Sequence, residues 1–168
     1  MATTTAAVND ARKASLAYLE SGDDDSVYEL IDGTPVLVSS TQHELDYTHM
    51  EVTLSMTAIR EAFVISAFHY WEKWARSLTN LNDRRDHFWV LKNRLARDYT
   101  IHPSLGEINR LTNVLKHGSG AFEHARSLAK VRPDLFSRLP NLYGDWTVSV
   151  SEEHVRQVFE VISCSGPR

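Results

Sequence analysis

The sequence of 168 residues contains one cysteine and no long apolar run. The lone Cys164 excludes a disulfide within the chain and a metal site built from cysteines. No uncharged stretch reaches the 18 or so residues of a membrane span, and no basic segment followed by an apolar run opens the chain. We therefore expect a cytoplasmic protein in a reducing compartment, with no membrane among its partners.

Several familiar catalytic signatures are also missing. The chain has no glycine-rich phosphate loop, no His-Glu-x-x-His pair and no Gly-x-Ser-x-Gly turn. It has 8 histidines, but neither His43 with His49 nor His117 with His124 has the spacing of metal ligands. The sequence thus predicts no metal and no cofactor.

The overall composition is that of an ordinary globular protein, with 42% hydrophobic and 24% charged residues. We find no internal repeat and no low-complexity linker, so a single domain covering residues 1–168 is expected. The patterns predict a mainly α fold, a bundle of five to six helices with a small accessory antiparallel β-sheet. The bundle core is expected at 41–130, the accessory strands at 23–40 and 145–150, and a flexible tail at 165–168.

Helix signals recur along the chain. Thr41-Gln42-His43-Glu44 and Ser104-Leu105-Gly106-Glu107 have the pattern of capping boxes, and Gly118 with Gly120 marks the end of the second of these helices. The predicted helices are 10–20, 41–78, 84–97, 105–117, 121–130 and 152–163.

Strand signals are fewer. Asp32-Gly33, between the apolar runs 27–31 and 34–38, predicts a hairpin with a type I′ turn. The alternation in 146–150 predicts a third strand, which we expect to pair with this hairpin.

Charge is unevenly distributed along the chain. Residues 1–83 hold 5 basic and 13 acidic side chains, whereas residues 84–138 hold 11 basic and 5 acidic ones. A basic excess of this kind suits a ligand that carries phosphate. It equally suits a charged face that packs over the acidic helices of the same protein.

The helix 105–117 presents a polar row. Arg110, Asn113 and His117 are spaced by three, four and seven residues, so they share one side, which we call the ridge. The opposite side is an apolar stripe of Leu105, Ile108, Leu111 and Leu115. Val114 lies beside the ridge, an odd place for an apolar residue, and predicts burial of this face against a partner.

The Arg110-x6-His117 spacing, with a polar residue in between, resembles the R-x4–6-H motif of HEPN domains, which are nucleotide-binding and ribonuclease domains. The long preceding helix with its Tyr70-Trp71-Glu72-x-Trp74 segment is similar to small bacterial HEPN-like proteins. The resemblance covers residues 41–130.

This resemblance implies a metal-independent endoribonuclease, or an RNA- or nucleotide-binding protein, that acts as a homodimer with two facing ridges. It implies His117 as general acid or base, Arg110 as the group that neutralises the transition state, and Asn113 as the group that orients the 2′-hydroxyl or a phosphate oxygen. Lys116 and Arg126 would hold flanking phosphates. A toxin–antitoxin or phage-defence setting, with an antitoxin partner, is part of the same expectation.

Each of these residues also has a structural explanation. A histidine in the last turn of a helix favours the helix dipole by about 0.3–1 kcal/mol without any catalysis, and Arg110 has Glu107 as a nearby ion-pair partner. His69 and Glu72 are second-choice site residues, in a segment whose aromatic side chains favour a core. The rival hypothesis is therefore a non-catalytic helical module for protein interaction.

Overall fold

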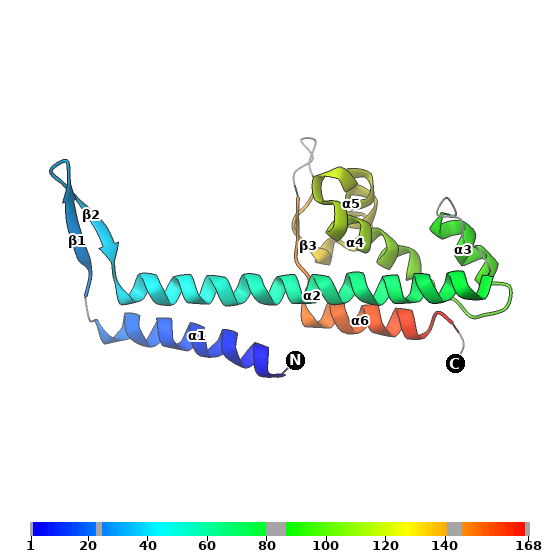
Figure 1. Ribbon diagram of the computed structural model, residues 1–168, viewed down its shortest axis with the longest axis horizontal. Helices are drawn as coiled ribbons and strands as arrows, with labels where there is room; N and C mark the ends of the chain where they lie inside the picture. The colour runs from blue at the N-terminus through cyan, green and yellow to red at the C-terminus, as the bar shows by residue number, and fades with distance from the viewer. Residues whose placement is uncertain (1, 23–24, 80–86, 141–145, 167–168) are drawn as a thin grey trace. The chain divides into compact units, whose positions relative to one another are not determined.

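The computed structural model describes residues 2–22, 25–79, 87–140 and 146–166 of the chain (Figure 1). Helices predominate and short antiparallel strand pairs accompany them, which confirms the predicted mainly α fold with accessory β-structure. The chain divides into two compact units, residues 1–58 and 59–168. The long helix α2 (Thr41–Thr79) contributes residues 41–58 to the first unit and residues 59–79 to the second.

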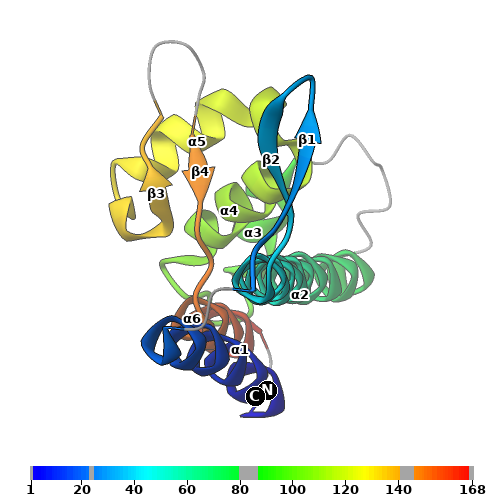
Figure 2. The same ribbon diagram turned by 90° about the vertical axis from the view of Figure 1, so that its left-hand side faces the viewer.

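The first unit contains the predicted hairpin. Strands β1 (Val27–Ile31) and β2 (Thr34–Ser39) pair antiparallel as a two-stranded sheet, which Figure 2 shows as a hairpin. Asp32 and Gly33 have φ angles of 52° and 78°, as a type I′ turn requires at both central positions. The turn prediction is therefore confirmed.

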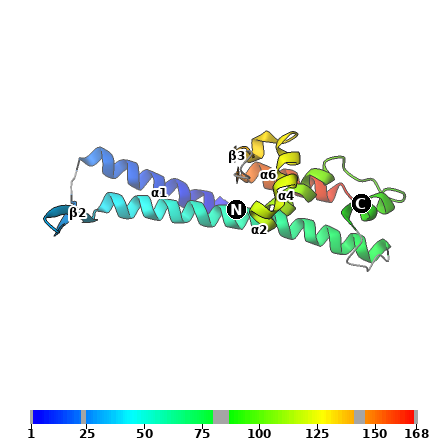
Figure 3. The same ribbon diagram turned by 90° about the horizontal axis from the view of Figure 1, so that it is seen from above.

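Helix α1 (Ala2–Ser21) begins well before the predicted start at Asp10. Asp10 is therefore an interior position of the helix rather than a cap. Figure 3 shows α1 running alongside the first part of α2. The contact includes polar groups, since Ser15 Oγ donates to Asp46 Oδ1 at 2.8 Å and accepts from Gln42 Nε2 at 2.9 Å.

The cap of α2 lies one residue earlier than the predicted capping box. Ser40 Oγ accepts from the backbone N–H of His43 at 3.1 Å, so Ser40 rather than Thr41 is the N-cap residue. Thr41 instead hydrogen-bonds to Asp25 through its hydroxyl and through its backbone N–H, the latter at 3.0 Å. These hydrogen bonds lower the pKa of Asp25 from 3.8 to about 2, and the bond from the Thr41 hydroxyl has the largest effect.

The second unit carries the hydrophobic core. This core is built from residues 59–79 of α2 together with α3 (Phe88–Leu95), α4 (Leu105–His117), α5 (Phe122–Ala129) and α6 (Glu152–Ser163). Phe68 and Trp71 are buried and their ring centroids lie 5.7 Å apart. Packing thus accounts for these two members of the aromatic segment of α2. Of the predicted helix 84–97, residues 84–86 lie outside the described residues.

Helix α4 has the predicted bounds but not the predicted cap. Gly118 ends it with a φ of 50°, whereas Ser104 makes no side-chain capping bond at its start. Val114 is 2% exposed and belongs to the core, while Leu115 is only partly buried. The burial of Val114 by its own chain removes the reason we had for a partner on this face. The core of the second unit covers this part of α4. The burial of an apolar residue beside the ridge therefore requires no second copy of the chain.

The late strand pairs differently from the prediction. Strand β4 (Thr147–Val148) pairs antiparallel with β3 (Phe136–Arg138), and not with the β1–β2 hairpin. Closing the short segment between β3 and β4 costs less entropy than pairing with residues more than 100 positions away. Phe136 is buried, which holds the pair against the core.

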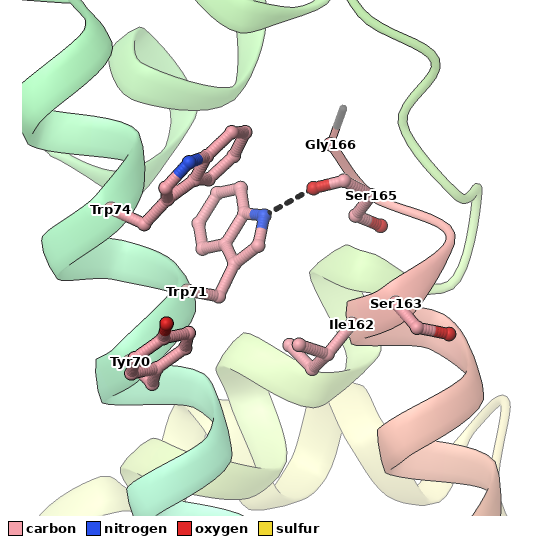
Figure 4. Close-up of a pocket in the computed structure, with 7 residues that line it drawn as sticks. All are labelled: Tyr70, Trp71, Trp74, Ile162, Ser163, Ser165 and Gly166. Carbon is pink, nitrogen blue, oxygen red and sulfur yellow. Dashed lines mark hydrogen bonds between the residues drawn. The ribbon is translucent and has the colours of Figure 1, made fainter. Parts of the chain in front are cut away.

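The segment after α6 packs instead of forming the expected tail. Ser165 is 1% exposed, and its carbonyl oxygen accepts from Trp71 Nε1 at 2.6 Å (Figure 4). Its hydroxyl donates to the Val161 carbonyl at 2.6 Å and accepts from the His102 backbone N–H at 3.1 Å. A serine with three such bonds is a fixed part of the core; residues 167–168 lie outside the described residues.

Among the helices that the structure describes, none is both long and apolar enough to cross a membrane.

Candidate functional site

The ridge lies on the solvent side of α4, as its spacing predicts. Arg110 and Asn113 are partly exposed and His117 is exposed. The guanidinium carbon of Arg110 lies 5.9 Å from the ring centroid of Trp89, a cation–π contact. The expected alternative partner, Glu107, lies 3.9 Å from Arg132 instead. Arg110 is therefore positioned by an aromatic ring and not by its neighbouring acid.

Asn113 is held by a bond within its own helix. Its Nδ2 group donates to the Asn109 carbonyl at 2.8 Å and lies 3.4 Å from Asn109 Oδ1. This bond directs one end of the Asn113 amide back along α4. The carbonyl Oδ1 of Asn113 is thus the atom through which it can accept a bond from a ligand.

Next to the ridge the second unit contains a cleft of about 380 Å³. Four segments of the chain contribute to its lining. The lining residues are Phe68, His69, Glu72 and Arg76 from α2; His87, Phe88 and Trp89 at the start of α3; Asn109, Thr112, Asn113 and Lys116 from α4; and His124 from α5. We call this the polar cleft.

Helical spacing explains why α4 lines the cleft with four polar residues. Asn109, Thr112, Asn113 and Lys116 stand at positions i, i+3, i+4 and i+7, which return to one side of a helix. Asn113 belongs both to this row and to the ridge. The polar cleft and the ridge therefore occupy adjacent strips of the same helix.

Positively charged groups and neutral donors outnumber acids in the polar cleft. Lys116 and Arg76 bring cations, and three imidazoles accompany them, whereas Glu72 is the one carboxylate in the described lining. Glu72 Oε1 accepts from Arg76 at 2.9 Å, an i,i+4 ion pair that is partly exposed. Because Arg76 offsets the charge of Glu72, the remaining groups give the cleft a character that attracts anions.

The predicted site residues divide into three groups. The polar cleft is lined by four of them, His69, Glu72, Asn113 and Lys116. His69 and Glu72 are the second-choice pair, whose segment has aromatic side chains that favoured a core. Arg110 lies beside the cleft through its contact with Trp89. His117 and Arg126 are exposed and lie outside the lining.

Sequence reasoning missed other members of the cleft. His87 and His124 come from segments far apart in the chain, and no spacing connects them with His69. The row from Asn109 to Lys116 did have a signal, because its polar residues recur at helical spacing. Asn113 and Lys116 of this row had been assigned, whereas Asn109 and Thr112 went unrecognised.

Three histidines in one cleft raise the question of a metal. Within residues 2–22, 25–79, 87–140 and 146–166, no group of three or more histidine, cysteine or acidic side chains is placed to hold one. The chemistry available in the cleft is therefore that of hydrogen-bond donors and positive charge.

Thr112 is the most unusual residue of the lining. It is 2% exposed, and its hydroxyl oxygen is buried without a hydrogen-bond partner among the residues that the structure describes. A buried hydroxyl without a partner costs about 1–3 kcal/mol. Such a group is a candidate for contact with a ligand.

No family model, curated protein or solved structure matches the chain. Functional inference therefore depends on the chemistry of the polar cleft and the ridge.

A second cleft, of about 260 Å³, lies between α2 and the segment after α6. Figure 4 shows its lining of Tyr70, Trp71, Trp74, Ile162, Ser163, Ser165 and Gly166. Among the residues that the structure describes there, the tyrosine is the one titratable side chain and none is charged. The polar cleft is thus the better candidate for chemistry.

Proposed function

We propose that the second unit binds RNA across the polar cleft and the ridge, and that the ridge cleaves it without a metal. The observation that carries this proposal is the convergence of Lys116 and three imidazoles on a cleft that adjoins Arg110. Phosphodiester groups are anions, and lysine and arginine contacts to them supply most of the affinity of proteins for nucleic acids. The segment with the basic excess, residues 84–138, contains α3, α4 and α5, which line this cleft.

Cleavage of RNA without a metal needs three functions. A base removes the proton of the 2′-hydroxyl, the 2′-oxygen attacks the phosphorus, and an acid protonates the 5′-oxygen as its bond to phosphorus breaks. The products are a 2′,3′-cyclic phosphate and a 5′-hydroxyl. His117 is the base or the acid in this proposal, because an imidazole exchanges protons near neutral pH.

The other two ridge residues stabilise the transition state and orient the substrate, while water exchanges the proton that His117 does not. Arg110 stabilises the charge that builds up on the phosphorus oxygens, since its guanidinium is always protonated. Asn113 accepts from the 2′-hydroxyl through Oδ1, because its Nδ2 group already donates to Asn109. Lys116 in the cleft and Arg126 outside it bind flanking phosphates.

The resemblance to HEPN domains extends the proposal to a homodimer with facing ridges, and to an antitoxin partner. Light scattering of the purified chain tests the first of these directly. A monomer that still cleaves RNA would separate the chemistry from the dimer.

The test of catalysis incubates labelled single-stranded RNA with the wild-type chain and with His117→Ala, in EDTA. We expect His117→Ala to slow cleavage by about a hundredfold or more while it still binds the RNA. His43→Ala is the matched control, because His43 is also an exposed helical histidine but lies in the first unit. Equal cleavage by wild type and His117→Ala, or cleavage by neither, contradicts the catalytic assignment.

Binding is measured separately by fluorescence anisotropy over a range of salt concentrations. Removal of a phosphate contact at Lys116 should weaken RNA binding. It should also reduce the slope of the logarithm of the binding constant against the logarithm of the salt concentration by about one. A wild-type chain that binds no RNA would contradict the whole proposal.

One observation favours the rival hypothesis of a protein-interaction module. In the first unit, most of the large apolar side chains of the β1–β2 hairpin are exposed, and they are Val27, Tyr28, Leu30, Ile31, Val36, Leu37 and Val38. Contiguous exposed apolar residues mark interaction surfaces. This function belongs to the first unit, so it is compatible with RNA binding by the second.

A further inference from the structure

We propose that the polar cleft is a pocket for one unpaired base of the RNA, and that the buried Thr112 hydroxyl binds the polar edge of that base. This inference rests on the proposed function, because it assumes that RNA is the ligand. It adds a substrate class, single-stranded RNA, and a residue that reads the base rather than the phosphate.

Thr112 differs from other helical threonines of the same chain. In α2, the hydroxyls of Thr48, Thr53, Thr57 and Thr79 each donate to the backbone carbonyl four residues earlier, at 2.8, 2.8, 3.0 and 2.9 Å. The Thr112 hydroxyl has no such bond and no other partner in the described part of the chain. Thr112 lines the cleft although its hydroxyl oxygen is buried, so a rotation of the side chain would let a ligand atom in the cleft satisfy it.

The hydroxyl can turn toward either side of the Thr112 side chain. Threonine in a helix populates two χ1 rotamers, so a single bond rotation exchanges its oxygen and its methyl group. A hydroxyl both donates and accepts, which suits the ring nitrogens, carbonyls and amino groups along the edge of a base. Phosphate oxygens only accept, and the cleft already supplies cationic donors for them.

The size and walls of the cleft fit one nucleotide. Its volume of about 380 Å³ lies within the range of ligand pockets and is large enough to hold a base. Phe68, Phe88 and Trp89 supply apolar walls, and the Phe88 and Trp89 rings meet at 4.9 Å in an edge-to-face arrangement. Proteins read RNA sequence mainly on unpaired bases that can enter such pockets.

Cations stand beside these walls. The ammonium of Lys92 lies 5.3 Å and the guanidinium of Arg110 lies 5.9 Å from the Trp89 ring centroid. A base held in the cleft would thus have positive groups near the phosphates on either side of it. This arrangement separates base binding inside the cleft from phosphate binding around it.

The test compares Thr112→Val with Thr112→Ser by anisotropy on three labelled probes. The probes are an eight-nucleotide single-stranded RNA, an abasic ribose-phosphate strand of equal length, and an RNA duplex. Wild type should bind the single strand about tenfold more tightly than the other two. The affinity of Thr112→Val for the single strand should fall about tenfold, because the variant lacks only the hydroxyl. Its affinity for the abasic strand should not change. Thr112→Ser should retain wild-type affinity.

Thermal stability of the free protein provides an independent readout. Thr112→Val removes a buried hydroxyl that has no partner, so its melting temperature should equal or exceed that of wild type. A purely structural role for the hydroxyl would instead lower it. Thr112→Val thus combines weaker binding with undiminished stability, which a general loss of folding cannot produce.

The other outcomes overturn the inference. Equal binding of the single and abasic strands, or unchanged single-strand affinity in Thr112→Val, would remove base recognition while leaving RNA binding intact. A lower melting temperature of Thr112→Val would show that the hydroxyl has a partner within the protein. Failure of wild type to bind any probe would overturn both this inference and the proposed function.

Discussion

Replacement of Val114 by alanine tests whether the face beside the ridge belongs to the core. Val114 is 2% exposed in the core of the second unit. The change removes two methyl-sized groups, worth about 0.8 kcal/mol each, and adds a term for the remaining cavity. The expected loss is about 2–3 kcal/mol, which corresponds to a melting temperature lower by roughly 4–12 °C in a chain of this size.

Tryptophan fluorescence is a suitable assay, because all 4 tryptophans lie in the second unit. Val131→Ala is the matched control, since it makes the same chemical change at a side chain that is 54% exposed. We expect the control to stay within about 0.5 kcal/mol of wild type. The measurement is repeated over about a hundredfold range of protein concentration, because a dimer interface makes stability depend on concentration.

Two results would refute the reasoning. If Val114→Ala were no less stable than Val131→Ala, the side chain would not be packed as the structure places it. If the melting temperature of wild type rose with concentration and that of Val114→Ala did not, Val114 would lie between copies of the chain. A loss that is the same at every concentration supports burial within one chain.

Further predictions concern the wall of the cleft and the acid stability of the first unit. In Gly106→Ala the new Cβ would lie 3.0 Å from Trp89 Cη2, so we expect weaker RNA binding and an altered near-ultraviolet circular dichroism spectrum. Gly120→Ala, whose Cβ meets nothing within 4 Å, should change neither measurement. The pKa of Asp25 falls from 3.8 to about 2 on folding, so its contribution to stability is present above pH 3.8 and is lost as the pH falls toward 2. Asp25→Asn should therefore flatten the decline of first-unit helicity in this window, and a decline as steep as that of wild type would contradict the assignment.

Local sequence signals were sufficient where one short segment determines the structure. Asp32-Gly33 fixes its hairpin because few residue pairs tolerate two positive φ angles, and Gly118 ends α4 for the same reason. The start of α4 was also located, although its Ser104 cap was not formed. Capping boxes at the starts of α2 and α4 were less well predicted, because Ser40 caps α2 in place of Thr41 and the Ser104 side chain makes no capping bond at α4.

Long-range packing was beyond sequence reasoning. The three residues of β3 are too few to show alternation, so the partner of β4 could not be recognised. Burial of Val114 depends on neighbours from other elements, which the spacing of one helix does not reveal. The ridge could be found because it lies on one helix, whereas the polar cleft brings together side chains from α2, α3, α4 and α5.

The bonds of Ser165 have a consequence for the order of folding. Trp71 and Ser165 are separated by 94 positions, yet they share one of the buried hydrogen bonds of the second unit. During synthesis, α2 therefore emerges long before Ser165, whose carbonyl oxygen accepts the hydrogen bond from the Trp71 indole. The core around Trp71 can close fully only when nearly the whole unit has been made, which favours slow, late consolidation over stepwise folding from the N-terminal side.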